Sequence, residues 1–468
     1  MSRSDWTTWT LTSVIFCLAT ASSLAGPPLP ATPTATPSLD SSASPGLGAG
    51  TAETRLATLE AELTRLHRSE LENARRQQIL AEEVRKLREA ATVPEAPSLQ
   101  SANGMGPAAS KVYQAQRGLS IGGYGQGWLS MLGASGSKNQ ADLKRVVLYT
   151  GYKFDDRLVL NSELEFEHAT TEGAGSVSVE FAQLDWLVSP ELNFRAGLLL
   201  APIGLLNETH EPLFYHGNER PEVERKVIPT TWRENGIGLF GKLGDTWEYR
   251  AYLMGSLAAR DFASGGLADG RQAGSKAVAE DWSVALRLDC HLTPELTLGG
   301  SLFSGDQGQG AVLAQDAAGT LAKPGAHLLL REGHLQYRRG GLQLRALGVV
   351  AELDEAEVLS RALALRGQGP VGSRLSGAYA EVAYDLMPHL NPASGASLDL
   401  YLRREAYDTL DQVAVGFADD PSQDVRVTTV GLDYKPEPRL VIKLDHRNFS
   451  SGKGIRPSEV NLGFGWVF

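Results

Sequence analysis

Charged side chains of both signs are concentrated in the segment 202–235, the strongest candidate in this sequence for a site that acts on ions or polar solutes. The basic ones are Arg220, Arg225, Lys226 and Arg233, and the acidic ones include Glu219, Glu222 and Glu224. Fixed charges that line a narrow water-filled passage bind passing ions and select among them. We therefore expect these residues to form a pore constriction or a solute-binding site.

The segment 202–235 also has the composition of an ordered loop. It contains four prolines and shows no helical or alternating period. Loops of this length are uncommon in compact domains and are usually functional or disordered. Apolar side chains such as Leu213, Phe214 and Trp232 need something to pack against, which argues against disorder. We expect a loop folded into a wet cavity, with an anchored surface loop as the alternative.

The remaining candidates for chemistry are weaker. His210 and His216 could be metal ligands, but no carboxylate–histidine spacing of a known metal site accompanies them, so we expect structural hydrogen bonds. Ser162 and His168 share a strand face, as a membrane-embedded hydrolase would need, yet six residues of strand separate them by about 20 Å. We expect no enzymatic activity, no metal and no cofactor.

The composition excludes several classes of protein. The chain has 468 residues and a net charge of −11, which argues against a nucleic acid partner because phosphate neutralisation requires clustered Lys and Arg. Mean hydropathy is −0.18, and beyond the N-terminus no apolar run reaches the roughly 18 residues of a membrane helix. The sequence therefore does not predict a helical membrane protein.

The N-terminal region predicts export followed by a spacer. Residues 1–25 have a short polar start and an apolar core, and they end in the small residues Ser23 and Ala25. This is the pattern of a signal peptide cleaved after Ala25, with an uncleaved anchor as the alternative. Residues 26–50 are rich in Pro, Ala, Ser and Thr and predict an unfolded linker.

Residues 51–91 predict a helix that associates with copies of itself. Apolar residues recur there at alternating steps of three and four: Leu56, Leu59, Leu63, Leu66, Leu80, Val84 and Leu87. This is the a/d pattern of a coiled coil, and an isolated helix of this length is marginally stable in water. A single amphipathic helix lying on the main domain is the alternative. A second linker is expected over residues 92–118.

Residues 119–468 alternate in polarity with a period of two. For example, Ile442 and Leu444 alternate with Lys443 and Asp445, so that one face is apolar and the other charged. The segments run to about ten residues, the length that crosses a bilayer at a tilt. We expect about sixteen strands, beginning near residues 119, 143, 157, 177, 192, 235, 246, 280, 294, 326, 341, 374, 396, 424, 438 and 457.

The connections between these segments indicate how the strands close. Short turns such as 155–156 and 244–245 alternate with long polar loops such as 258–280 and 305–325. This alternation is typical of an outer-membrane barrel, and no repeat motif favours a propeller or a solenoid. The fold class expected is therefore an all-β transmembrane barrel of antiparallel strands, preceded by an α-helical coiled-coil segment.

Aromatic residues support the barrel. The last strand places Val460, Leu462, Phe464, Trp466 and the terminal Phe468 on one face, which resembles the ending of bacterial outer-membrane proteins. Further aromatic residues lie near the ends of expected strands, where interfacial girdles form. They are Tyr152, Trp186, Trp247, Trp282 and Tyr407.

In this arrangement the segment 202–235 is the third long loop, and its motifs resemble those of a known family. Pro202-Ile203-Gly204, His210-Glu211-Pro212, Glu219-Arg220-Pro221, Ile228-Pro229-Thr230-Thr231-Trp232-Arg233-Glu234 and Gly236-Ile237-Gly238 resemble the phosphate-selective porin O and P family. The resemblance implies an export signal, a helical segment, a sixteen-strand barrel and a homotrimer. General porins fold the third loop into the lumen, where it narrows the channel. It covers nearly all of the mature chain, but its specific motif is confined to this loop and the next strand.

Alternation also predicts which strand residues line a pore. The expected pore-lining residues are Arg145, Arg250, Arg287, Arg345, Arg403, Lys443 and Arg447 with Glu163, Glu165 and Glu167. Further acidic residues share the inward face, and the two signs then nearly cancel. A phosphate-selective pore would concentrate positive charge instead. The residues themselves therefore do not indicate phosphate specificity, although anions such as phosphate stay among the candidate solutes.

The function expected from the sequence is that of an outer-membrane porin, a passive diffusion channel for small hydrophilic solutes or ions. Its expected partners are two further copies in a homotrimer, outer-membrane lipid and the solutes themselves, and the coiled coil is expected in the bacterial periplasm. An active transporter would need about 22 strands and a folded plug. The alternative is a structural envelope tether, in which the barrel anchors a periplasmic coiled coil.

Overall fold

The computed structural model describes residues 52–90, 100–133, 138–170, 173, 175–312, 314–315 and 321–468. The expected signal peptide (1–25) and first linker (26–50) lie outside the described residues. The chain divides into two compact units, Met1–Ala96 and Pro97–Phe468. None of the described helices is long and apolar enough to span a membrane.

Within the first unit, residues Ala52–Ala90 form a single helix of 39 residues, α1. Its described apolar side chains are largely exposed, with Leu63 at 67%, Leu66 at 54% and Leu80 at 64%. The side chains of the other seam residues, Leu56, Leu59, Val84 and Leu87, lie outside the described part. An exposed leucine row on one chain is what a partner helix would cover, so the coiled coil stays a prediction.

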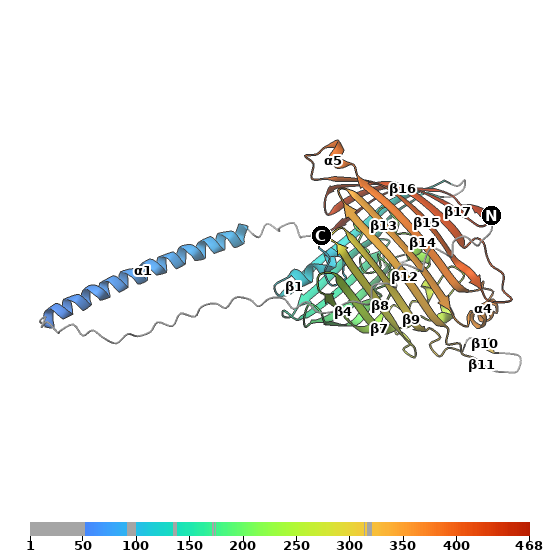
Figure 1. Cartoon of the computed structure of the whole chain (residues 1–468), viewed down its shortest axis with the longest axis horizontal. Helices are drawn as coiled ribbons and strands as arrows, with labels where there is room; N and C mark the ends of the chain where they lie inside the picture. Colours follow the sequence, from blue (N-terminus) through green and yellow to red (C-terminus); the bar gives the residue numbers. More distant parts are fainter. Residues whose placement is uncertain are drawn as a thin grey trace. The chain divides into compact units, whose positions relative to one another are not determined.

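The second unit is a closed antiparallel barrel of sixteen long strands (Figure 1). The strands are β1 (Gly118–Leu132), β2 (Gln140–Lys153), β3 (Leu158–Glu167), β4 (Ser176–Leu187), β5 (Asn193–Leu200), β6 (Arg233–Leu243), β7 (Trp247–Gly255), β8 (Trp282–Thr293), β9 (Leu296–Asp306), β12 (His327–Arg339), β13 (Leu342–Leu353), β14 (Gly372–Asp385), β15 (Ser397–Val413), β16 (Asp424–Glu437), β17 (Leu440–Ser451) and β19 (Glu459–Val467). Every strand begins within three residues of its expected position, so the predicted fold class is confirmed.

Each strand pairs with its neighbours in the chain, and β1 closes the barrel by pairing with β2 on one side and β19 on the other. Because every strand then has two partners, the sheet has no open edge and its backbone polar groups are satisfied internally. The smaller elements lie in the connections: α3 (Val223–Lys226), η1 (Ala259–Asp261), η2 (Ala268–Gly270), β10 (Ala314–Gln315), β11 (Leu321–Ala322), α4 (Ala356–Ala364), α5 (Met387–Leu390) and β18 (Gly454–Ile455).

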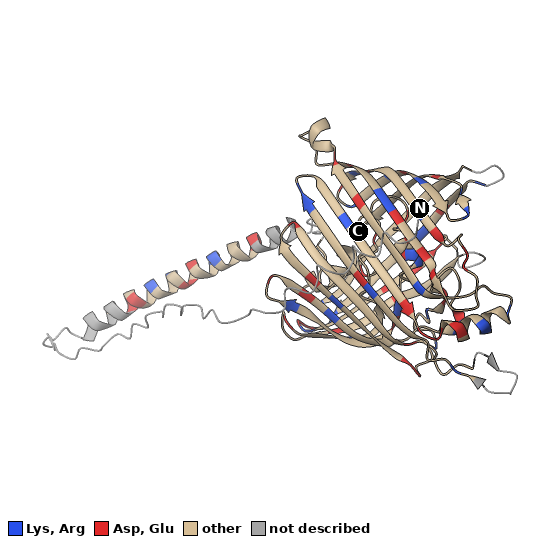
Figure 2. Cartoon of the chain, turned by 45° about the vertical axis from the view of Figure 1, so that its right-hand side comes forward, with Lys and Arg blue, Asp and Glu red and all other residues tan. Residues whose placement is uncertain are grey.

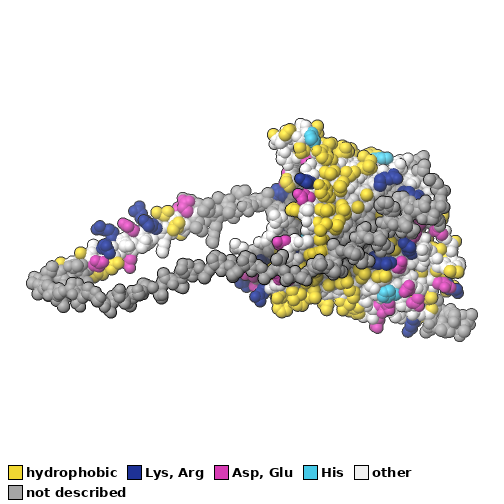
Figure 3. All heavy atoms as spheres, viewed as in Figure 1, with side chains coloured by type: hydrophobic (Ala, Val, Ile, Leu, Met, Phe, Trp, Pro, Cys, Tyr) yellow, Lys and Arg dark blue, Asp and Glu magenta, His cyan; other side chains and the backbone are white. Residues whose placement is uncertain are grey.

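The strands are apolar outside and charged inside, the reverse of a soluble sheet. On β17, Lys443 and Asp445 are 1% and 2% exposed, whereas Ile442 and Leu444 are 43% and 46% exposed. Hydrophobic side chains consequently cover the outer face of the barrel (Figure 3), and Lys, Arg, Asp and Glu are interspersed along the strands (Figure 2). This is the pattern expected when lipid contacts the outer wall.

Four of the five expected girdle aromatics lie on this outer surface: Tyr152, Trp186, Trp247 and Trp282. The fifth expectation was wrong, because Tyr407 is buried inside the barrel. It has the same parity on β15 as Arg403, so the alternation that points the arginine inward also points the tyrosine inward.

The second expected linker, 92–118, contains a folded element. Residues Pro107–Gln114 form helix α2, whose Pro107, Ala108, Ala109, Ser110 and Val112 are buried. The helix contacts β1, β2 and β3. Asn161 of β3 donates to the carbonyl of Ala109 at 2.9 Å, and the hydroxyl of Tyr113 donates to Asp185 of β4 at 2.6 Å. The linker prediction was therefore wrong over these residues, which occupy the inside of the barrel wall.

Part of the interior is an apolar core. Ile203, Leu206 and Val227, from the connection between β5 and β6, belong to one buried cluster with Leu330 of β12 and Val349 of β13. Residues of the β7–β8 connection and of α4 join the same cluster. A long segment without sheet pairing needs such contacts to stay ordered, because fixing its backbone costs about 1–2 kcal/mol per residue.

Candidate pore constriction

The connection between β5 and β6, residues 201–232 and here called L3, is closed at its base by Asn207. The Asn207 amide donates to the carbonyls of Ala201 and Trp232 at 2.8 and 2.9 Å, and its oxygen accepts from the Trp232 amide at 2.7 Å. Trp232 is fully buried and packs on Phe303 of β9, with ring centroids 4.4 Å apart. These bonds join the two ends of L3 at the point where it leaves the wall.

The expected loop boundary needs one correction. The sequence placed residues 233–235 in the loop, but strand β6 begins at Arg233. Arg233 therefore belongs to the barrel wall, where its guanidinium lies 3.6 Å from Glu180 of β4. The remaining residues of the expected constriction lie in L3.

L3 crosses the lumen and contacts the opposite wall. Arg403, on β15, donates to the carbonyls of His216 and Glu219 at 3.0 and 3.2 Å. Lys443, on β17, donates to the carbonyls of Tyr215 and Gly217, both at 2.8 Å. Counting only the sixteen long strands, β15 is eight strands from β5 in either direction around the barrel. The loop therefore spans the full width of the barrel.

The tip of L3 fits closely against this wall. The backbone and side-chain nitrogens of Asn218 both donate to Asp445 Oδ2, at 2.7 and 2.6 Å. Gly463 of β19 faces Asn218 so closely that a Cβ at residue 463 would lie 1.9 Å from the Asn218 side chain. Gly217 has φ +78°, and a Cβ there would lie 2.3 Å from the Tyr401 hydroxyl. Both positions require glycine.

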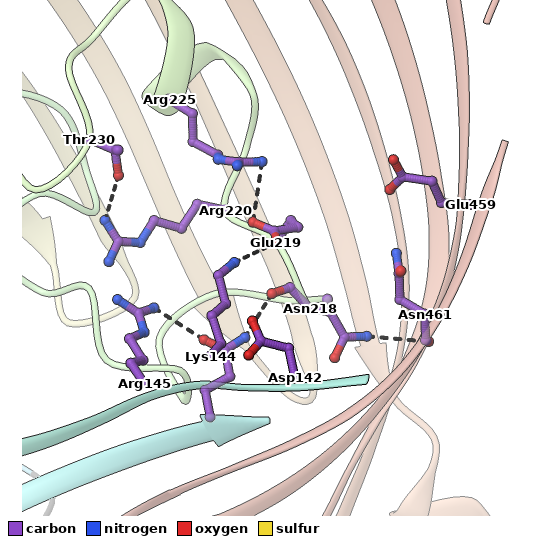
Figure 4. Close-up of polar contacts among 12 residues, drawn as sticks. Asp142, Lys144, Arg145, Asn218, Glu219, Arg220, Arg225, Thr230, Glu459 and Asn461 are labelled. Carbon is purple, nitrogen blue, oxygen red and sulfur yellow. Dashed lines mark hydrogen bonds and ion pairs between the residues drawn. The ribbon is translucent and has the colours of Figure 1, made fainter. Parts of the chain in front are cut away.

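Three of the expected charged residues form one ionic group at the tip. Glu219 binds Lys144 of β2 at 2.5 Å and Arg225 at 3.2 Å (Figure 4). Glu222 binds Arg225 at 2.7 Å and Arg447 of β17 at 2.6 Å. Burial opposes the ionisation of Glu219, but Arg225, Lys144 and Arg447 outweigh it and hold its pKa well below the usual range. The two carboxylates are thus charged and compensated.

Arg220 is different, because the acceptors of its guanidinium are neutral. Its Nη1 donates to the hydroxyl of Thr230 at 2.7 Å (Figure 4) and to that of Thr231 at 3.1 Å, and the residue is buried. Hydroxyl acceptors do not cancel a positive charge, so this cation can attract an anion in the lumen.

Further basic groups meet around the phenol of Tyr215. Arg145 of β2 donates to the Tyr215 hydroxyl at 3.2 Å, and Lys443 lies 4.2 Å from the centre of its ring. Burial opposes ionisation of the phenol, yet Arg145, Lys443 and Arg220 together lower the pKa of Tyr215 to about 8. The basic group of Arg145, Arg220, Lys443 and Lys144 therefore makes the potential positive at this point.

The other two expected constriction residues separate from this group. Glu224 is buried, accepts from the amide of Leu206 at 2.8 Å and accepts from the hydroxyl of Tyr379 of β14 at 2.7 Å, so it fixes the loop backbone. Lys226, at the end of α3, is exposed. The structure therefore brings together Glu219, Glu222 and Arg225, places Arg220 nearby, and gives Glu224 a packing role.

The expected pore-lining residues occupy the inner wall, but most are buried in ion pairs instead of facing water. Arg250 and Arg287 pair with Asp289 at 3.1 and 2.7 Å, and Arg403 pairs with Glu405 at 2.9 Å. Arg345 lies 3.8 Å from Glu381, Arg447 pairs with Glu222, and Arg145 lies 3.9 Å from Glu165. Except for Glu222 of L3, these carboxylates lie on the same strand as the arginine or on a neighbouring strand, so most of these ion pairs form within the inner wall itself.

A second polar group lies under the base of L3. His210 Nε2 lies 3.3 Å from Glu163 Oε1 of β3 and 3.1 Å from Glu180 Oε2 of β4. All three residues are buried. Sequence reasoning named His210 and Glu163 separately and missed Glu180. The available signal was its parity, because Glu180 alternates with the outward-facing Val177 and Val179. Glu167 lies at the end of β3, where it accepts from the Ser176 hydroxyl at 2.7 Å.

The chain has a relative of similar sequence among known proteins. No protein-family model matches the chain. An uncharacterised protein of Aquifex aeolicus (strain VF5) is 37% identical over 374 residues, which cover 77% of this chain and 82% of that protein. The chain belongs to the same family as the Aquifex protein. This relationship covers most of both chains.

Among solved structures, the Salmonella typhi OmpF complex with daunomycin matches over 75% of this chain and 98% of its own, at 12% identity and a TM-score of 0.50. The outer membrane channel DcaP of Acinetobacter baumannii matches over 75% of this chain and 97% of its own, at 12% identity and a TM-score of 0.47. The structural neighbours of the chain are bacterial outer-membrane porins. At this identity the OmpF match establishes the fold.

Proposed function

We propose that the protein is a porin of the bacterial outer membrane, through which small hydrophilic solutes and ions diffuse passively. The observation that carries this proposal is the passage of L3 across the lumen of a closed barrel. L3 brings Arg220, Arg225, Glu219 and Glu222 into that lumen, and the outer wall around it is apolar. In porins the barrel interior is polar and water-filled, and a charged loop inside it acts on the solutes that pass.

The proposed orientation follows from the connections. Long loops such as 256–281 and 354–371 leave one end of the barrel, and short turns such as 154–157 and 244–246 leave the other. In outer-membrane barrels the short turns face the periplasm. The chain enters β1 at the end of the barrel that carries the short turns, so we propose that helix α1 lies in the periplasm, after removal of the export signal expected at residues 1–25.

The proposed solute preference is a modest one for anions, phosphate among them. Glu219 and Glu222 are compensated by basic partners, whereas Arg220 contacts neutral hydroxyls. Arg220 therefore leaves a positive charge without a carboxylate partner at the constriction, and nearby fixed charges act on ions in a narrow lumen with little screening. The resemblance of L3 to the phosphate-selective porin O and P family supports the same preference.

An enzymatic function is not proposed. Ser162 and His168 were the candidate hydrolase pair, and each has another partner. Ser162 shares a hydrogen bond of 2.7 Å with Thr150, and His168 pairs with Asp142 at 2.7 Å. Neither contact activates a serine nucleophile, which requires a histidine within hydrogen-bond reach.

The structural tether remains the second candidate, because α1 supports it. At 1.5 Å per residue, a helix of 39 residues is about 58 Å long, which suits a periplasmic spacer. The exposed Leu63, Leu66 and Leu80 also support the proposed homotrimer, in which three copies of α1 would cover them.

Single-channel recording in a planar lipid bilayer tests the proposal. A porin gives discrete conductance steps and a reversal potential that shifts in a salt gradient. The tether predicts a folded barrel that inserts without conductance steps. Folding is checked in the same preparation by the change in gel mobility on boiling, so that a silent bilayer cannot be attributed to unfolded protein.

A further inference from the structure

Glu163, Glu180 and His210 form a buried group that the diffusion of solutes does not explain. They come from β3, β4 and L3, and they are 0%, 1% and 1% exposed. One ligand atom from each residue lies within 4.8 Å of the other two. Carboxylate oxygen and imidazole nitrogen are both ligands for Zn²⁺ and related divalent ions.

The distances match a metal coordination shell. Tetrahedral Zn²⁺ binds nitrogen and oxygen at about 2.0–2.2 Å, which places neighbouring ligand atoms about 3.3–3.5 Å apart. His210 Nε2 lies 3.3 Å from Glu163 Oε1 and 3.1 Å from Glu180 Oε2. Small adjustments of the side chains would therefore complete the geometry.

The imidazole is also oriented as a metal ligand. His210 Nδ1 lies 2.8 Å from the carbonyl of Asn207, to which it donates, so Nε2 is left facing the two carboxylates. This is the usual arrangement of a ligating histidine, whose other nitrogen is held by a backbone carbonyl. Asn207 is itself fixed by the bonds that close the base of L3.

The pairing of β4, the strand that carries Glu180, is irregular at this point. The pairing of β3 with β4 shifts between Glu163 and Leu164, so that both Glu180 and Phe181 are buried. Such a bulge re-aims side chains and is common next to functional sites. Here it brings the Glu180 carboxylate to the side of β4 that faces His210.

Two oxygens in this group form no hydrogen bond of good geometry within the described part of the chain, although one of them lies 3.1 Å from His210 Nε2. They are Glu163 Oε2 and Glu180 Oε2, on side chains that are almost fully buried. A buried, unsatisfied carboxylate oxygen costs free energy, whereas a bound cation would satisfy it. Positive charge lies at the edge of the group. Arg233 is 3.6 Å from Glu180, and Arg145 is 3.9 Å from Glu165, the next inward-facing residue of β3 after Glu163.

We propose that Glu163, Glu180 and His210 bind a divalent transition-metal ion, with Zn²⁺ as the probe, and that this ion joins the base of L3 to the barrel wall. The site goes beyond the porin function and does not depend on it. The competing occupant is a proton, which would make His210 an imidazolium between two carboxylates. Metal analysis separates the two, because a proton leaves no metal in the purified protein.

The test uses the mature full-length chain without a polyhistidine tag, refolded in detergent with Zn²⁺ and then dialysed. Elemental analysis should find close to one zinc ion per chain in the wild type. Glu180→Gln and His210→Gln should each lower occupancy at least about 10-fold. His216→Gln is the matched control, since His216 is a buried L3 histidine that also lies near two carboxylates, Glu381 and Asp399. It should keep its zinc.

A measurement on the wild type alone covers the case in which a variant fails to fold. Protein refolded with Co²⁺ should show the intense visible absorption of four-coordinate cobalt, and added Zn²⁺ should abolish it. The proposal is overturned if the folded wild type retains no zinc and gives no cobalt spectrum. It is equally overturned if His216→Gln loses as much zinc as His210→Gln, or if both keep it.

Discussion

Arg403 of β15 donates to the backbone carbonyl of Glu219 at 3.2 Å, although the two residues are 184 positions apart in the chain. The same guanidinium donates to the carbonyl of His216 and pairs with Glu381 and Glu405. Arg403 therefore fixes the tip of L3 to the wall opposite the strands from which L3 begins and ends. The position of the constriction depends on this contact.

Replacing Arg403 with Met should release the tip of L3. The variant removes the donors to His216 and Glu219 and leaves the buried Glu405 without its cation, a loss on the order of 3–5 kcal/mol. We expect a larger and noisier single-channel conductance and lower stability to denaturant. Arg404→Met is the control, because Arg404 is the next residue on β15 and is exposed on the outer face. Equal conductance in both variants would show that Arg403 does not hold the constriction.

Replacing Arg220, Arg225 and Arg233 together with Ala should shift the reversal potential in a salt gradient towards cations. Arg220→Ala alone should shift it in the same direction, because it removes a positive charge that contacts neutral hydroxyls, whereas removal of Arg225 or Arg233 also leaves carboxylates unpaired. The control is Arg331→Ala, an exposed arginine of β12 that pairs with Glu352. If Arg220→Ala and Arg331→Ala give the same reversal potential, Arg220 does not act on permeating ions.

Glu219→Gln should destabilise the barrel in a pH-dependent way. The folded-state pKa of Glu219 lies below the unfolded value of 4.5, so its ion pairs stabilise the protein above about pH 4.5 and lose this effect as the pH falls further. At neutral pH the free energy of unfolding of the variant should be about 1.5–3 kcal/mol lower than that of the wild type. Denaturant unfolding in detergent, followed by tryptophan fluorescence, measures the difference. If the difference in free energy of unfolding between wild type and variant stays constant down to strongly acid pH, the assigned ion pairs are wrong.

Deleting residues 100–116 should raise the conductance. The deletion removes α2, which packs inside the wall formed by β1, β2 and β3, and it leaves the start of β1 at Gly118. The matched control is deletion of residues 51–91, which removes α1 and no part of the barrel unit. If the two deletion variants have the same single-channel conductance, α2 does not obstruct the passage.

Deleting residues 51–91 should weaken the proposed trimer and leave the barrel folded, since a closed barrel satisfies its own backbone groups. Unheated wild-type protein should run on a gel as a large species that collapses on boiling, and the deletion variant should run as a monomer. Replacing Leu63, Leu66 and Leu80 with Ala should have the same effect in part, whereas alanine at the exposed Glu62, Arg65 and Arg76 should not. A wild-type monomer in mild detergent, measured by light scattering, would exclude the proposed assembly.

The strands could be predicted because their information is local. A lipid-facing residue such as Ile442 and an interior residue such as Lys443 are neighbours in sequence, and the side-chain period of a strand is two. Tyr152 and Trp186 obey the same rule, although they were expected on the outer surface because they are aromatic residues near strand ends. Tyr407 was misassigned because an aromatic near a strand end was given more weight than its parity.

Helix α2 could not be predicted in the same way. Its sequence is short, and its burial depends on a contact 103 residues away, where Glu211 of L3 accepts from the amide of Ala108 at 3.0 Å. That carboxylate satisfies a free amide at the helix N-terminus. The composition of the segment alone is that of a linker, and the helix is recognised only once its contact with L3 is known.

The sequence by itself determined the barrel class and where its strands begin, because alternation marks each strand and the lengths of the connections indicate closure. Alternation also determined which strand residues face inward, such as Lys443 and Arg403. Tertiary structure decided which inward residues meet. Arg403 contacts Glu219, Lys144 contacts Glu219, and His210 contacts Glu163 and Glu180 only because L3 crosses the lumen and brings distant strands into contact through one loop. Pairings of this kind depend on the path of the backbone in space, and no periodicity in the sequence records that path.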